Sequence, residues 1–493
     1  MATTSGLAHK LSSSSHASSR TPNGPHHTAP GLIQDILGSD LFARFLQDKA
    51  SCAVSSHCDL SKHPANCSCQ NSYSFRATTM PTKADRKHLD ATVAAFHSNY
   101  ASPSNWGHER WHDSLYPALS KPTRYAALVN QYVPRPEVDK VLAATSTQEL
   151  RPIELPKLPS GVEAGAALTP PRILLLERMT PTTPAPENES AGKSTKDDNF
   201  LFPPPQPTPT PSDLSWQLMT HWNMDAASAL GAHMLDVQPG DRVLDLCAAP
   251  GGKSVALAQT IFPQLHASSP SPRPEALTGC LHSNEVDAAR NKRLANNLRA
   301  YLPSALFATN AVRVLRLDAA DARAVTQLPL GAGGYDKVLL DAPCSSERHI
   351  IHAHVKAAAG GRIADEMARW RKGSSKGLAK LQADILMTAL RAVRVGGRVV
   401  YSTCSIEAGE NDGVVQKMLA TVEKERKKFG LPWDVRIELG REKGKEGGSA
   451  VDEALEKLSE ETRYGRIAVP DIEGGGQWGP LFFCVITKVP RKA

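Results

Sequence analysis

Two cysteines stand directly after apolar, strand-like segments of this 493-residue chain. Cys344 follows Asp341 in "LLDAPC", and Cys404 closes "VVYSTC". A buried cysteine is usually inert packing, which is what we expect of Cys280 and Cys484 within other strands. Two cysteines at the ends of neighbouring strands, one of them beside a proline and a carboxylate, instead indicate nucleophilic chemistry at a thiolate.

The glycine-rich segment "VLDLCAAPGGKS", residues 243–254, predicts a ligand site. It resembles a phosphate-binding loop, G-x-x-x-x-G-K-[ST], but Cys247 stands where that loop requires a glycine and Pro250 interrupts it. This pattern therefore excludes a nucleoside triphosphate. Gly251 and Gly252 allow backbone N–H groups to approach a ligand closely, and the following helix offers its positive N-terminal end.

Two carboxylates after the next strands indicate which ligand binds there. Glu285 follows "LTGCLHSN", where a carboxylate can accept both hydroxyl groups of a ribose. Asp318 follows "VRVLRL", where it can meet an adenine amino group. A ribose partner and an adenine partner without a phosphate loop predict a nucleoside that carries no phosphates, and S-adenosylmethionine has this chemistry.

The paired cysteines suit one use of such a methyl donor. C5 of cytosine is too weak a nucleophile to take a methyl group, but a thiolate that adds at C6 makes C5 enamine-like. A carboxylic acid near N3 stabilises the developing charge, and loss of the C5 proton after methyl transfer releases the thiolate. A thiol with an ordinary pKa of about 8.5 must be activated for this reaction, and Lys253 is the candidate cation.

A parallel sheet must position these residues, since ligands of open α/β sheets bind at the carboxyl ends of the strands. From residue 214 to about residue 419, strand-like and helical segments alternate, as in a parallel sheet covered on both faces. The predicted strands are "RVLDL", "LTGCLHSNE", "VRVLRLDA", "YDKVLLDAP" and "GRVVYSTC", and "GRIAVP" and "LFFCVITKV" close the domain.

The N-terminal sequence carries less specific signals. Residues 1–34 contain no Asp or Glu, which fits both an organelle transit peptide and a disordered tail, and residues 31–46 have the spacing of a short amphipathic helix. The cluster Cys52–Cys69 lacks paired CxxC spacing, so we predict a Ser-rich linker and no metal. A formal net charge of +7 permits a polyanionic partner. No apolar run approaches the roughly 18 residues of a membrane span, which predicts a soluble protein.

The motifs "DLCAAPGGKS", "DAPCSS" and "YSTCSIEAGEN" resemble those of the Nop/Sun family of RNA cytosine-5 methyltransferases, over roughly residues 216–488. The resemblance implies an α/β fold with a Rossmann-like S-adenosylmethionine-dependent methyltransferase core and a mostly parallel, doubly wound sheet. Cys404 would be the nucleophile and Cys344 would help product release. Asp341 would contact the base near N3, assisted by Lys253. The cofactor-binding residues implied by the family motifs are Cys247, Ala248, Ala249, Pro250, Gly251, Gly252, Lys253, Glu285, Arg290, Asp318 and Asp341.

Three further segments, "PCSSERHI", "RYAALVN" and "WGPLFFCVI", resemble the organelle branch of this family. That branch methylates mitochondrial small-subunit ribosomal RNA or a mitochondrial transfer RNA, so the resemblance implies a mitochondrial protein, with a nucleolar or cytoplasmic location as the alternative. No compact RNA-binding PUA module is recognisable, and the Pro-rich insertion departs from the family pattern. The RNA target and the need for an accessory protein therefore stay open.

These observations predict four regions and one function. The regions are a disordered or transit region with a short helix at 1–84, a helical N-terminal RNA-binding region at 85–180, a Pro/Thr-rich linker or insertion at 181–213 and a methyltransferase catalytic domain at 214–490. We expect RNA to contact Arg110, Trp111 and Arg124, although Trp111 suits a core position equally well. The expected function is that of a monomeric S-adenosylmethionine-dependent RNA (cytosine-5) methyltransferase, and the alternative is an inactive RNA-binding or ribosome-assembly factor with the same fold.

Overall fold

The computed structural model describes residues 82–144, 149–158, 173–178, 202–208, 217–269, 277–441 and 453–491. The predicted helix at 31–46, the Cys52–Cys69 cluster and most of the predicted linker at 181–213 lie outside these ranges. Within the described residues, no helix combines the length and apolarity needed to cross a membrane. In the same ranges, no group of three or more His, Cys, Asp or Glu side chains is arranged to hold a metal ion.

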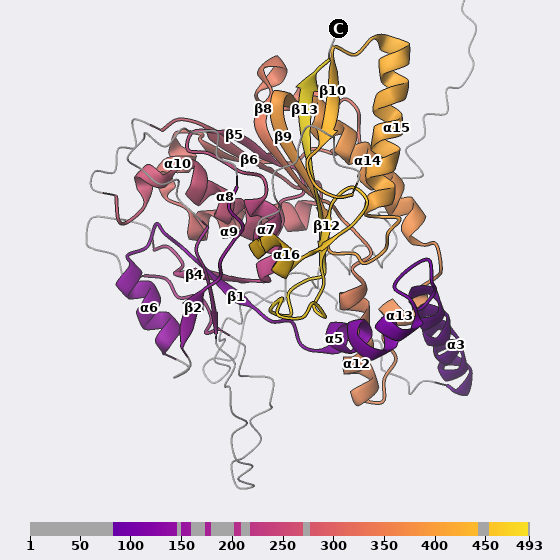
Figure 1. Cartoon of the computed structure of the whole chain (residues 1–493). Coiled ribbons are helices and arrows are strands. Elements are labelled where there is room, and N and C mark those ends of the chain that lie inside the picture. Colours follow the sequence, from indigo (N-terminus) through magenta and orange to yellow (C-terminus); the bar gives the residue numbers. More distant parts are fainter. Residues whose placement is uncertain are drawn as a thin grey trace, which may run out of the picture. The chain divides into compact units, whose positions relative to one another are not determined.

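A nine-stranded sheet organises the C-terminal part of the chain (Figure 1). Its order is β11-β12-β13-β9-β8-β5-β6-β7, and β10 pairs with β13. The strands from β9 to β7 are parallel, whereas β13 runs antiparallel to β9. All seven strands predicted from the sequence lie in this sheet, while β10 and β11 were not predicted. The strands are β5 (Arg242–Asp245), β6 (Cys280–Asn284), β7 (Val312–Leu315), β8 (Tyr335–Asp341), β9 (Val393–Thr403), β10 (Trp433–Ile437), β11 (Glu460–Glu461), β12 (Arg466–Ala468) and β13 (Leu481–Pro490).

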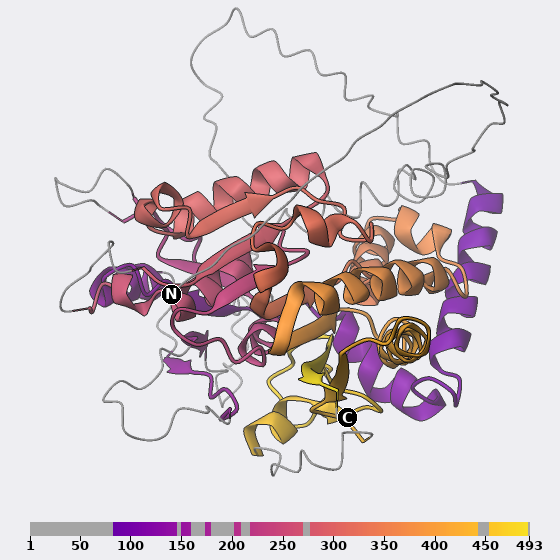
Figure 2. The same cartoon turned by 90° about the horizontal axis from the view of Figure 1, so that it is seen from above.

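Helices cover this sheet on both sides (Figures 1 and 2). They are α7 (Ala226–His233), α8 (Gly252–Ile261), α9 (Ala288–Tyr301), α10 (Ser304–Ala308), α11 (Ala324–Gln327), α12 (Glu347–Ala359), α13 (Asp365–Arg369), α14 (Ser375–Ala392), α15 (Asp412–Phe429) and α16 (Glu453–Leu458), with short 3-10 turns η3 (Pro263–Leu265) and η5 (Gly331–Gly333). Because successive residues of a strand point to opposite faces, each central strand contributes side chains to the hydrophobic core on either side of the sheet. Val338 and Leu340 of β8 pack in the core that includes α14 and α15, and Leu339 packs in the core that includes α7, α8 and α9.

A second, antiparallel sheet corrects the prediction that residues 85–180 are helical. Its order is β2-β3-β1-β4, formed by β1 (Ala126–Val129), β2 (Leu150–Pro152), β3 (Leu175–Arg178) and β4 (His221–Met224). The strands are only three or four residues long and pair with segments far away in the chain, so they leave no local periodic pattern. Strand β4, which falls in the predicted catalytic domain, pairs with β1, so this sheet crosses the predicted boundaries at 180 and 213.

The N-terminal region also contains the helices that the sequence indicated. These are α3 (Lys83–Tyr100), α4 (His108–Arg110), the π-helical turn η1 (Trp111–Leu115), α5 (Tyr116–Ser120) and α6 (Arg135–Ala143). Helix α3 begins at a capping box, in which Asp85 N donates to the Thr82 hydroxyl and the Asp85 carboxylate accepts from Thr82 N. Its buried residues, among them Phe96 and Tyr100, pack in the same core as α14 and α15.

Of the residues expected to contact RNA, Trp111 is buried and occupies the alternative core position, whereas Arg110 and Arg124 are engaged in ion pairs within the protein. Trp111 is 0 % exposed and donates from Nε1 to His97 Nδ1 over 3.0 Å. Arg110 forms ion pairs with Glu460 and Asp471. Arg124 donates to a carboxylate oxygen of Glu177 over 3.1 Å, and its guanidinium lies over the Trp478 ring. Mixed aromatic and basic residues therefore build a core and its ion pairs in this region.

Replacing Trp111 by alanine should lower the free energy of unfolding by about 3–5 kcal/mol, because the change leaves a large cavity in the core. Urea denaturation of the purified protein measures this loss. Asp113→Ala is the matched control, since the Asp113 side chain is exposed in the same π-helical turn and should change stability by less than about 0.5 kcal/mol. Unchanged stability combined with weaker RNA binding for the Trp111 variant would restore the RNA-contact interpretation.

Candidate active site

The candidate active site lies where the parallel strands β8 and β9 end. In their register, Asp341 stands opposite Ser402, so the loops that follow the two strands leave the same edge of the sheet. These loops carry Cys344 and Cys404, and their Sγ atoms lie 3.2 Å apart. The structure thus brings together the two cysteines that the sequence singled out.

The two thiols differ in exposure and share one hydroxyl neighbour. Cys344 is only 1 % exposed, whereas Cys404 is partly exposed. Ser346 Oγ lies 2.6 Å from Cys404 Sγ and 3.9 Å from Cys344 Sγ. Helix α12 begins directly after Ser346, so both thiols lie near the positive end of a helix, which favours a thiolate.

Lys253 and Asp341 form an ion pair in this site, with Nζ and Oδ2 2.9 Å apart. Lys253 also donates to the Ser228 hydroxyl of α7, and Ser402 Oγ donates to Asp341 Oδ1 over 3.1 Å. No role was assigned from the sequence to either serine, although Ser402 lies in the segment "VVYSTC" that marked Cys404. They fix the direction of the ammonium group and of the carboxylate, which leaves Asp341 held at both oxygens.

Two buried glutamates brace the loops that carry the cysteines. Glu347 and Glu410 are 1 % and 0 % exposed, and the Ser345 hydroxyl lies within hydrogen-bond distance of a carboxyl oxygen of each. Glu347 Oε2 also accepts from Ser405 Oγ over 3.0 Å, while Glu410 Oε2 accepts from Gln382 Nε2 over 2.8 Å. The loop that carries Cys344 and the loop that carries Cys404 are therefore connected to one another through Ser345 and these two carboxyl groups.

Burial disfavours the charged form of both carboxyl groups in this pair. Burial raises the pKa of Glu347, and burial together with the nearby charge of Glu347 raises the pKa of Glu410 to about 8. Ionising both carboxyl groups is unfavourable, because the two negative charges would repel one another on either side of the Ser345 hydroxyl. At neutral pH the pair therefore retains a proton. The sequence shows Glu347 in "PCSSERHI" and Glu410 in "YSTCSIEAGEN", but a motif does not reveal that these side chains are buried.

Residues of the N-terminal helical region also hydrogen-bond to the Glu347–Glu410 pair and to the loop that carries Cys404. Tyr100, the last residue of α3, donates from its hydroxyl to Glu347 Oε1 over 3.2 Å. Trp106 donates from Nε1 to the carbonyl oxygen of Ile406 over 3.3 Å, two residues after Cys404. The N-terminal helical region thus contacts the loop that carries Cys404 directly.

The cofactor groove lies at the ends of β5 and β6. Asp245 is 1 % exposed, its Oδ2 accepts from Ser254 Oγ over 2.7 Å, and its Oδ1 has no hydrogen-bond partner among the described residues. Burial raises the pKa of Asp245 to about 7. Glu285 is 3 % exposed and forms an ion pair with Arg290 at 2.9 Å. An orphaned carboxylate oxygen beside a second buried carboxylate fits the hydroxyl and amino groups of S-adenosylmethionine.

Asn284 holds three strand ends of this groove side by side, and sequence reasoning gave it no role. Its Nδ2 donates to the carbonyl oxygens of Leu246 and Leu317, each over 3.0 Å. Its Oδ1 accepts from Leu317 N over 2.8 Å. Because Asp318 directly follows Leu317, the same amide fixes where the predicted adenine partner leaves β7. The Asp318 carboxylate itself accepts from Ala320 N over 3.0 Å.

The structure gives Gly252 a packing role besides the ligand-binding role that the sequence suggested. Gly251 has φ +122° and precedes the first residue of α8, as the predicted turn requires. At Gly252, however, an added Cβ would lie 2.7 Å from Trp222 Nε1, so the second sheet fills that space. Gly252 is required for packing against Trp222 and not only for the approach of a ligand. The preceding loop residues are tied down as well, since Arg290 donates to Ala249 O over 3.2 Å and Asn297 donates to Pro250 O over 2.8 Å.

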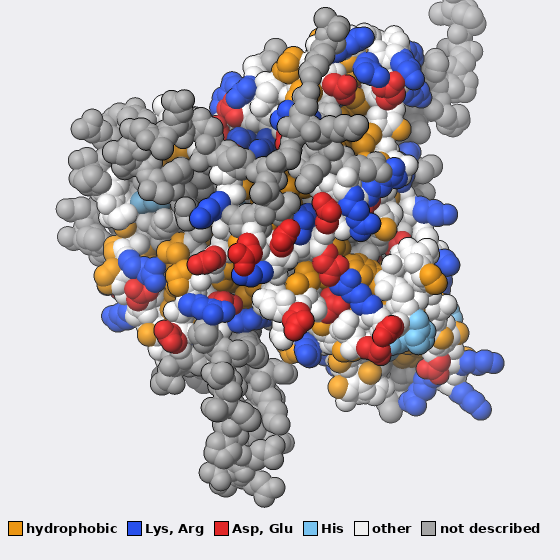
Figure 3. Space-filling model, viewed as in Figure 1, with side chains coloured by type: hydrophobic (Ala, Val, Ile, Leu, Met, Phe, Trp, Pro, Cys, Tyr) orange, Lys and Arg blue, Asp and Glu red, His pale blue; other side chains and the backbone are white. Residues whose placement is uncertain are grey.

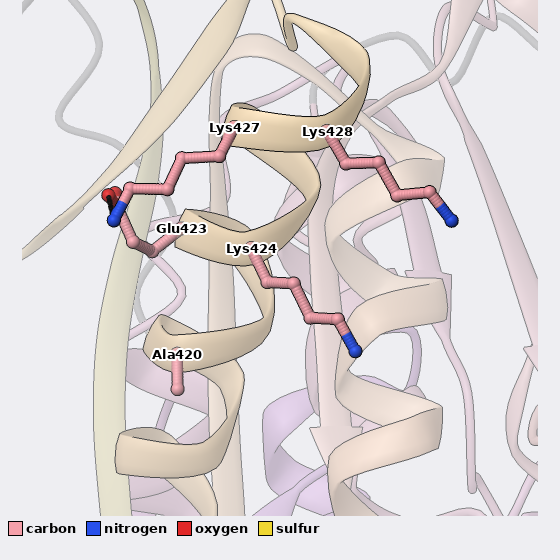
Figure 4. A pocket seen from close by; sticks show the side chains of 5 residues that line it. All are labelled: Ala420, Glu423, Lys424, Lys427 and Lys428. Carbon is pink, nitrogen blue, oxygen red and sulfur yellow. Dashed lines mark ion pairs between the residues drawn. The ribbon is translucent and has the colours of Figure 1, made fainter.

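A surface hollow on α15 is separate from this site (Figure 4). It is lined by Ala420, Glu423, Lys424, Lys427 and Lys428. Lys427 pairs with Glu423 at 3.0 Å, while Lys424 and Lys428 point to the other side of the helix. Helix α15 starts next to the cysteine loops, but the hollow lies two to four turns further along it, so its lysines do not contribute to the cysteine site.

Comparison with known proteins agrees with this fold. A mostly parallel sheet with helices on both sides is the architecture of the Rossmann-like methyltransferases. Residues 232–446 match the family model described as 16S rRNA methyltransferase RsmB/F. This part of the chain is therefore similar to the RsmB/F (Nop/Sun) family.

Individual relatives share this region. The chain is 37% identical over 236 residues to the mitochondrial tRNA (cytosine(34)-C(5))-methyltransferase of Danio rerio, covering 48% of this chain and 56% of the relative. It is 32% identical over 272 residues to the 5-cytosine rRNA methyltransferase NSUN4 of Xenopus laevis, covering 55% and 57%. The chain thus spans little more than half the length of these two relatives. With NSUN4 of Xenopus tropicalis it shares 29% over 390 residues, 76% of this chain and 86% of the relative.

Among solved structures, a methyltransferase homolog protein from Pyrococcus horikoshii is similar with a TM-score of 0.44. The two chains share 19% sequence identity, and the match covers 83% of this chain and 99% of that one.

The buried glutamate pair predicts how stability depends on pH. A carboxyl group with a pKa of about 8 in the folded protein and 4.5 in the unfolded chain keeps a proton that the unfolded chain has lost. The free energy of unfolding therefore falls as the pH rises from 4.5 to about 8. Glu410→Gln removes this titration, so its loss of unfolding free energy between pH 6 and pH 8.5 should be smaller by about 2–3 kcal/mol, since each pH unit below the folded pKa contributes about 1.4 kcal/mol.

Thermal unfolding at the two pH values measures this difference. The matched control is Glu456→Gln on α16, whose side chain is exposed and which should lose as much stability as the unaltered protein. An equally steep loss for the Glu410 variant would show that Glu410 is ionised throughout this pH range.

Proposed function

We propose that this protein is an S-adenosylmethionine-dependent RNA (cytosine-5) methyltransferase that acts through a covalent bond between Cys404 and C6 of the target cytosine. The observation that carries the proposal is the 3.2 Å distance between Cys404 Sγ and Cys344 Sγ beside the Lys253–Asp341 ion pair. The match of residues 232–446 to the RsmB/F family model supports it.

The exposure of the two thiols assigns them different roles in this proposal. Cys404 is partly exposed, so it can reach C6 of a cytosine that has left its base stack. The Cys404 sulfur gives an electron pair to C6, and the ring charge that develops is stabilised near N3 by Asp341. Cys344 is buried next to Cys404, and in this proposal it helps to break the C6–S bond and so to release the product.

Asp341 can act at N3 because its environment holds it in place. Lys253 and Ser402 each donate to one of its oxygens, so the carboxyl group cannot rotate freely. Lys253 thereby neutralises the charge of Asp341 in the resting site. A proton passed between this pair and N3 would balance the charge that enters the ring and leaves it again.

The cofactor would be held by the groove at the ends of β5 and β6. When bound, S-adenosylmethionine supplies the methyl group as an electrophilic sulfonium. Glu285 would accept from the ribose hydroxyls, and Arg290 would neutralise its charge, as it does in the ion pair of the structure. The residues proposed to line this groove are Cys247, Ala248, Ala249, Pro250, Gly251, Gly252, Lys253, Glu285, Arg290, Asp318 and Asp341.

The proposed substrate is RNA of a mitochondrial ribosome or a mitochondrial tRNA. Relatives are named as a mitochondrial tRNA (cytosine(34)-C(5))-methyltransferase and as 5-cytosine rRNA methyltransferases, which supports this choice and a mitochondrial location. The net charge of +7 suits a polyanionic partner. On the face drawn in Figure 3, Lys and Arg side chains alternate with Asp and Glu, so RNA would meet scattered cations on this side.

The two cysteines should give opposite results in a methylation assay. Cys404→Ala should abolish transfer of labelled methyl groups to RNA, because no thiolate can add to C6. Cys344→Ala should accumulate a protein–RNA adduct that survives denaturing electrophoresis, because the bond to Cys404 forms but is not broken. Cys280→Ser is the control, since Cys280 is the first residue of β6 and so lies at the edge of the sheet opposite to the cysteine pair.

The outcomes separate the alternatives. An adduct formed by the Cys404 variant would reverse the two roles. RNA binding by the unaltered protein without any methyl transfer, across mitochondrial ribosomal and transfer RNA, would instead support an inactive RNA-binding factor.

The groove makes a separate prediction that does not require RNA. Glu285→Gln should weaken binding of S-adenosylmethionine by at least about tenfold, because hydrogen bonds from the ribose hydroxyls to a charged acceptor are lost. Isothermal titration calorimetry measures the affinity. Glu456→Gln, on exposed α16, should bind as the unaltered protein does. Equal affinity for the Glu285 variant would remove Glu285 from the proposed groove.

A further inference from the structure

Ser346 occupies the N-cap position of α12, but its hydroxyl does not cap that helix. A serine at this position normally accepts a hydrogen bond from a backbone N–H of the first helical turn. Here the side chain makes no such bond. Its Oγ lies instead 2.6 Å from Cys404 Sγ and 3.9 Å from Cys344 Sγ. The hydroxyl is therefore directed at the two sulfur atoms.

The backbone of Ser346 is unusual as well. Its φ of +54° and ψ of +60° lie in the left-handed region, which is disfavoured for a residue with a Cβ atom. Such conformations persist where the surroundings over-determine them, and they cluster at functional sites.

The surroundings of Ser346 do over-determine it. On one side, Ser345 N donates to Glu410 Oε2 over 3.1 Å and the Ser345 hydroxyl bonds to both buried glutamates. On the other side, His349 N donates to the carbonyl oxygen of Ser346 over 2.9 Å as α12 begins. The two glutamates thus act as positioning residues that hold the Ser346 hydroxyl against Cys404.

We propose that Ser346 is a further catalytic residue, whose hydroxyl donates a hydrogen bond to the Cys404 sulfur and so stabilises the thiolate form of Cys404. The hydrogen bond is inferred from the geometry alone, while its use in catalysis rests on the proposed function. Ser346 is 4 % exposed, so the bond lies away from bulk water, where a hydrogen bond to a charged group is strongest. The N-terminal end of α12 adds its positive potential at the same point.

The proton and electron balance requires no further reactant. The Ser346 proton stays on Oγ throughout, and the hydroxyl only donates a hydrogen bond. When Cys404 attacks C6, an electron pair of the sulfur enters the S–C bond, the negative charge moves into the ring and the hydrogen bond weakens. When that bond breaks, the pair returns to the sulfur and the hydrogen bond reforms. The Cys344 thiol, 3.9 Å away, can donate to the same Oγ and strengthen it as a donor.

The test measures the reactivity of Cys404 without RNA or cofactor. The full-length protein is treated with iodoacetamide between pH 6 and pH 9.5, and peptide mass spectrometry quantifies alkylation at Cys404 alone. In Ser346→Ala the midpoint of this pH profile should rise by about one unit, so that alkylation at pH 7 slows about tenfold. Ser346→Gly should show the same change, although glycine accepts the left-handed backbone without strain.

A matched control tests whether the change in alkylation comes from the Ser346 hydroxyl and not from the loss of any serine at a helix N-cap. Ser374→Ala changes another serine at a helix N-cap, that of α14, which also makes no cap bond but is exposed and has an ordinary helical backbone. Its alkylation profile should equal that of the unaltered protein. Melting temperatures accompany each profile, so that an unfolded variant is recognised, and Ser346→Gly keeps the test decisive where Ser346→Ala is unstable.

Each outcome bears on one proposal. Unchanged or faster alkylation in both Ser346 variants would overturn the inference, because the hydroxyl would then accept from the thiol and favour its protonated form. A slowed profile in a protein that methylates no RNA would uphold the hydrogen bond and sink the proposed function. A slowed profile together with a matching loss of methyl transfer, and full activity for Ser374→Ala, supports both.

Discussion

The parallel pairing of β8 with β9 is the constraint on which the candidate site depends. Their register sets Asp341 beside Ser402 and sends two short loops out of the same edge of the sheet, so that two thiols sixty positions apart in the chain lie 3.2 Å from one another. Val338 and Leu340 bury in one core and Leu339 in the other. A slip of one residue would exchange these faces, so burial on both sides of the sheet holds the register and with it the cysteine pair.

Around this pair the protein retains two carboxyl groups away from water. Burying carboxyl groups is unfavourable unless they are hydrogen-bonded or protonated. Glu347 and Glu410 meet both conditions, since hydroxyl and amide donors surround them and burial raises the pKa of each. Their partners come from α3, from α14 and from both cysteine loops, including Tyr100 and Gln382. The N-terminal helices are therefore part of the support of the candidate active site.

The cofactor side of the site depends on the second sheet in a similar way. The glycine turn passes so close to Trp222 that any side chain at residue 252 would collide with the indole. Trp222 belongs to β4, whose partner β1 precedes the predicted linker in the chain. The loop that is proposed to hold the methyl donor is thus packed against a sheet built from distant segments, and Asn284 fixes the neighbouring strand ends.

The sequence by itself determined the main sheet and the identity of the reactive groups. Its seven longer apolar segments predicted the strands correctly, and cysteines placed directly after two of them predicted the pair, because parallel strands end at a common edge. The strands β1 to β4 escaped prediction although β5, β7 and β12, which were predicted, are also only three or four residues long. They lie outside the alternation of strand-like and helical segments, and their partners lie far away in the chain.

Tertiary structure alone decided what the remaining polar and aromatic residues do. Arg110, Trp111 and Arg124 have the composition of an RNA-binding surface, yet their partners are Glu460, Asp471, His97 and Trp478, which fold against them from other parts of the chain. No role was assigned from the sequence to Glu347, Glu410 or Ser346, although all three lie in the quoted motifs. Their burial and their direction toward the thiols arise only when α3, α12 and α14 close around the strand ends, because burial is a property of contacts between distant segments and not of a residue's neighbours in the chain.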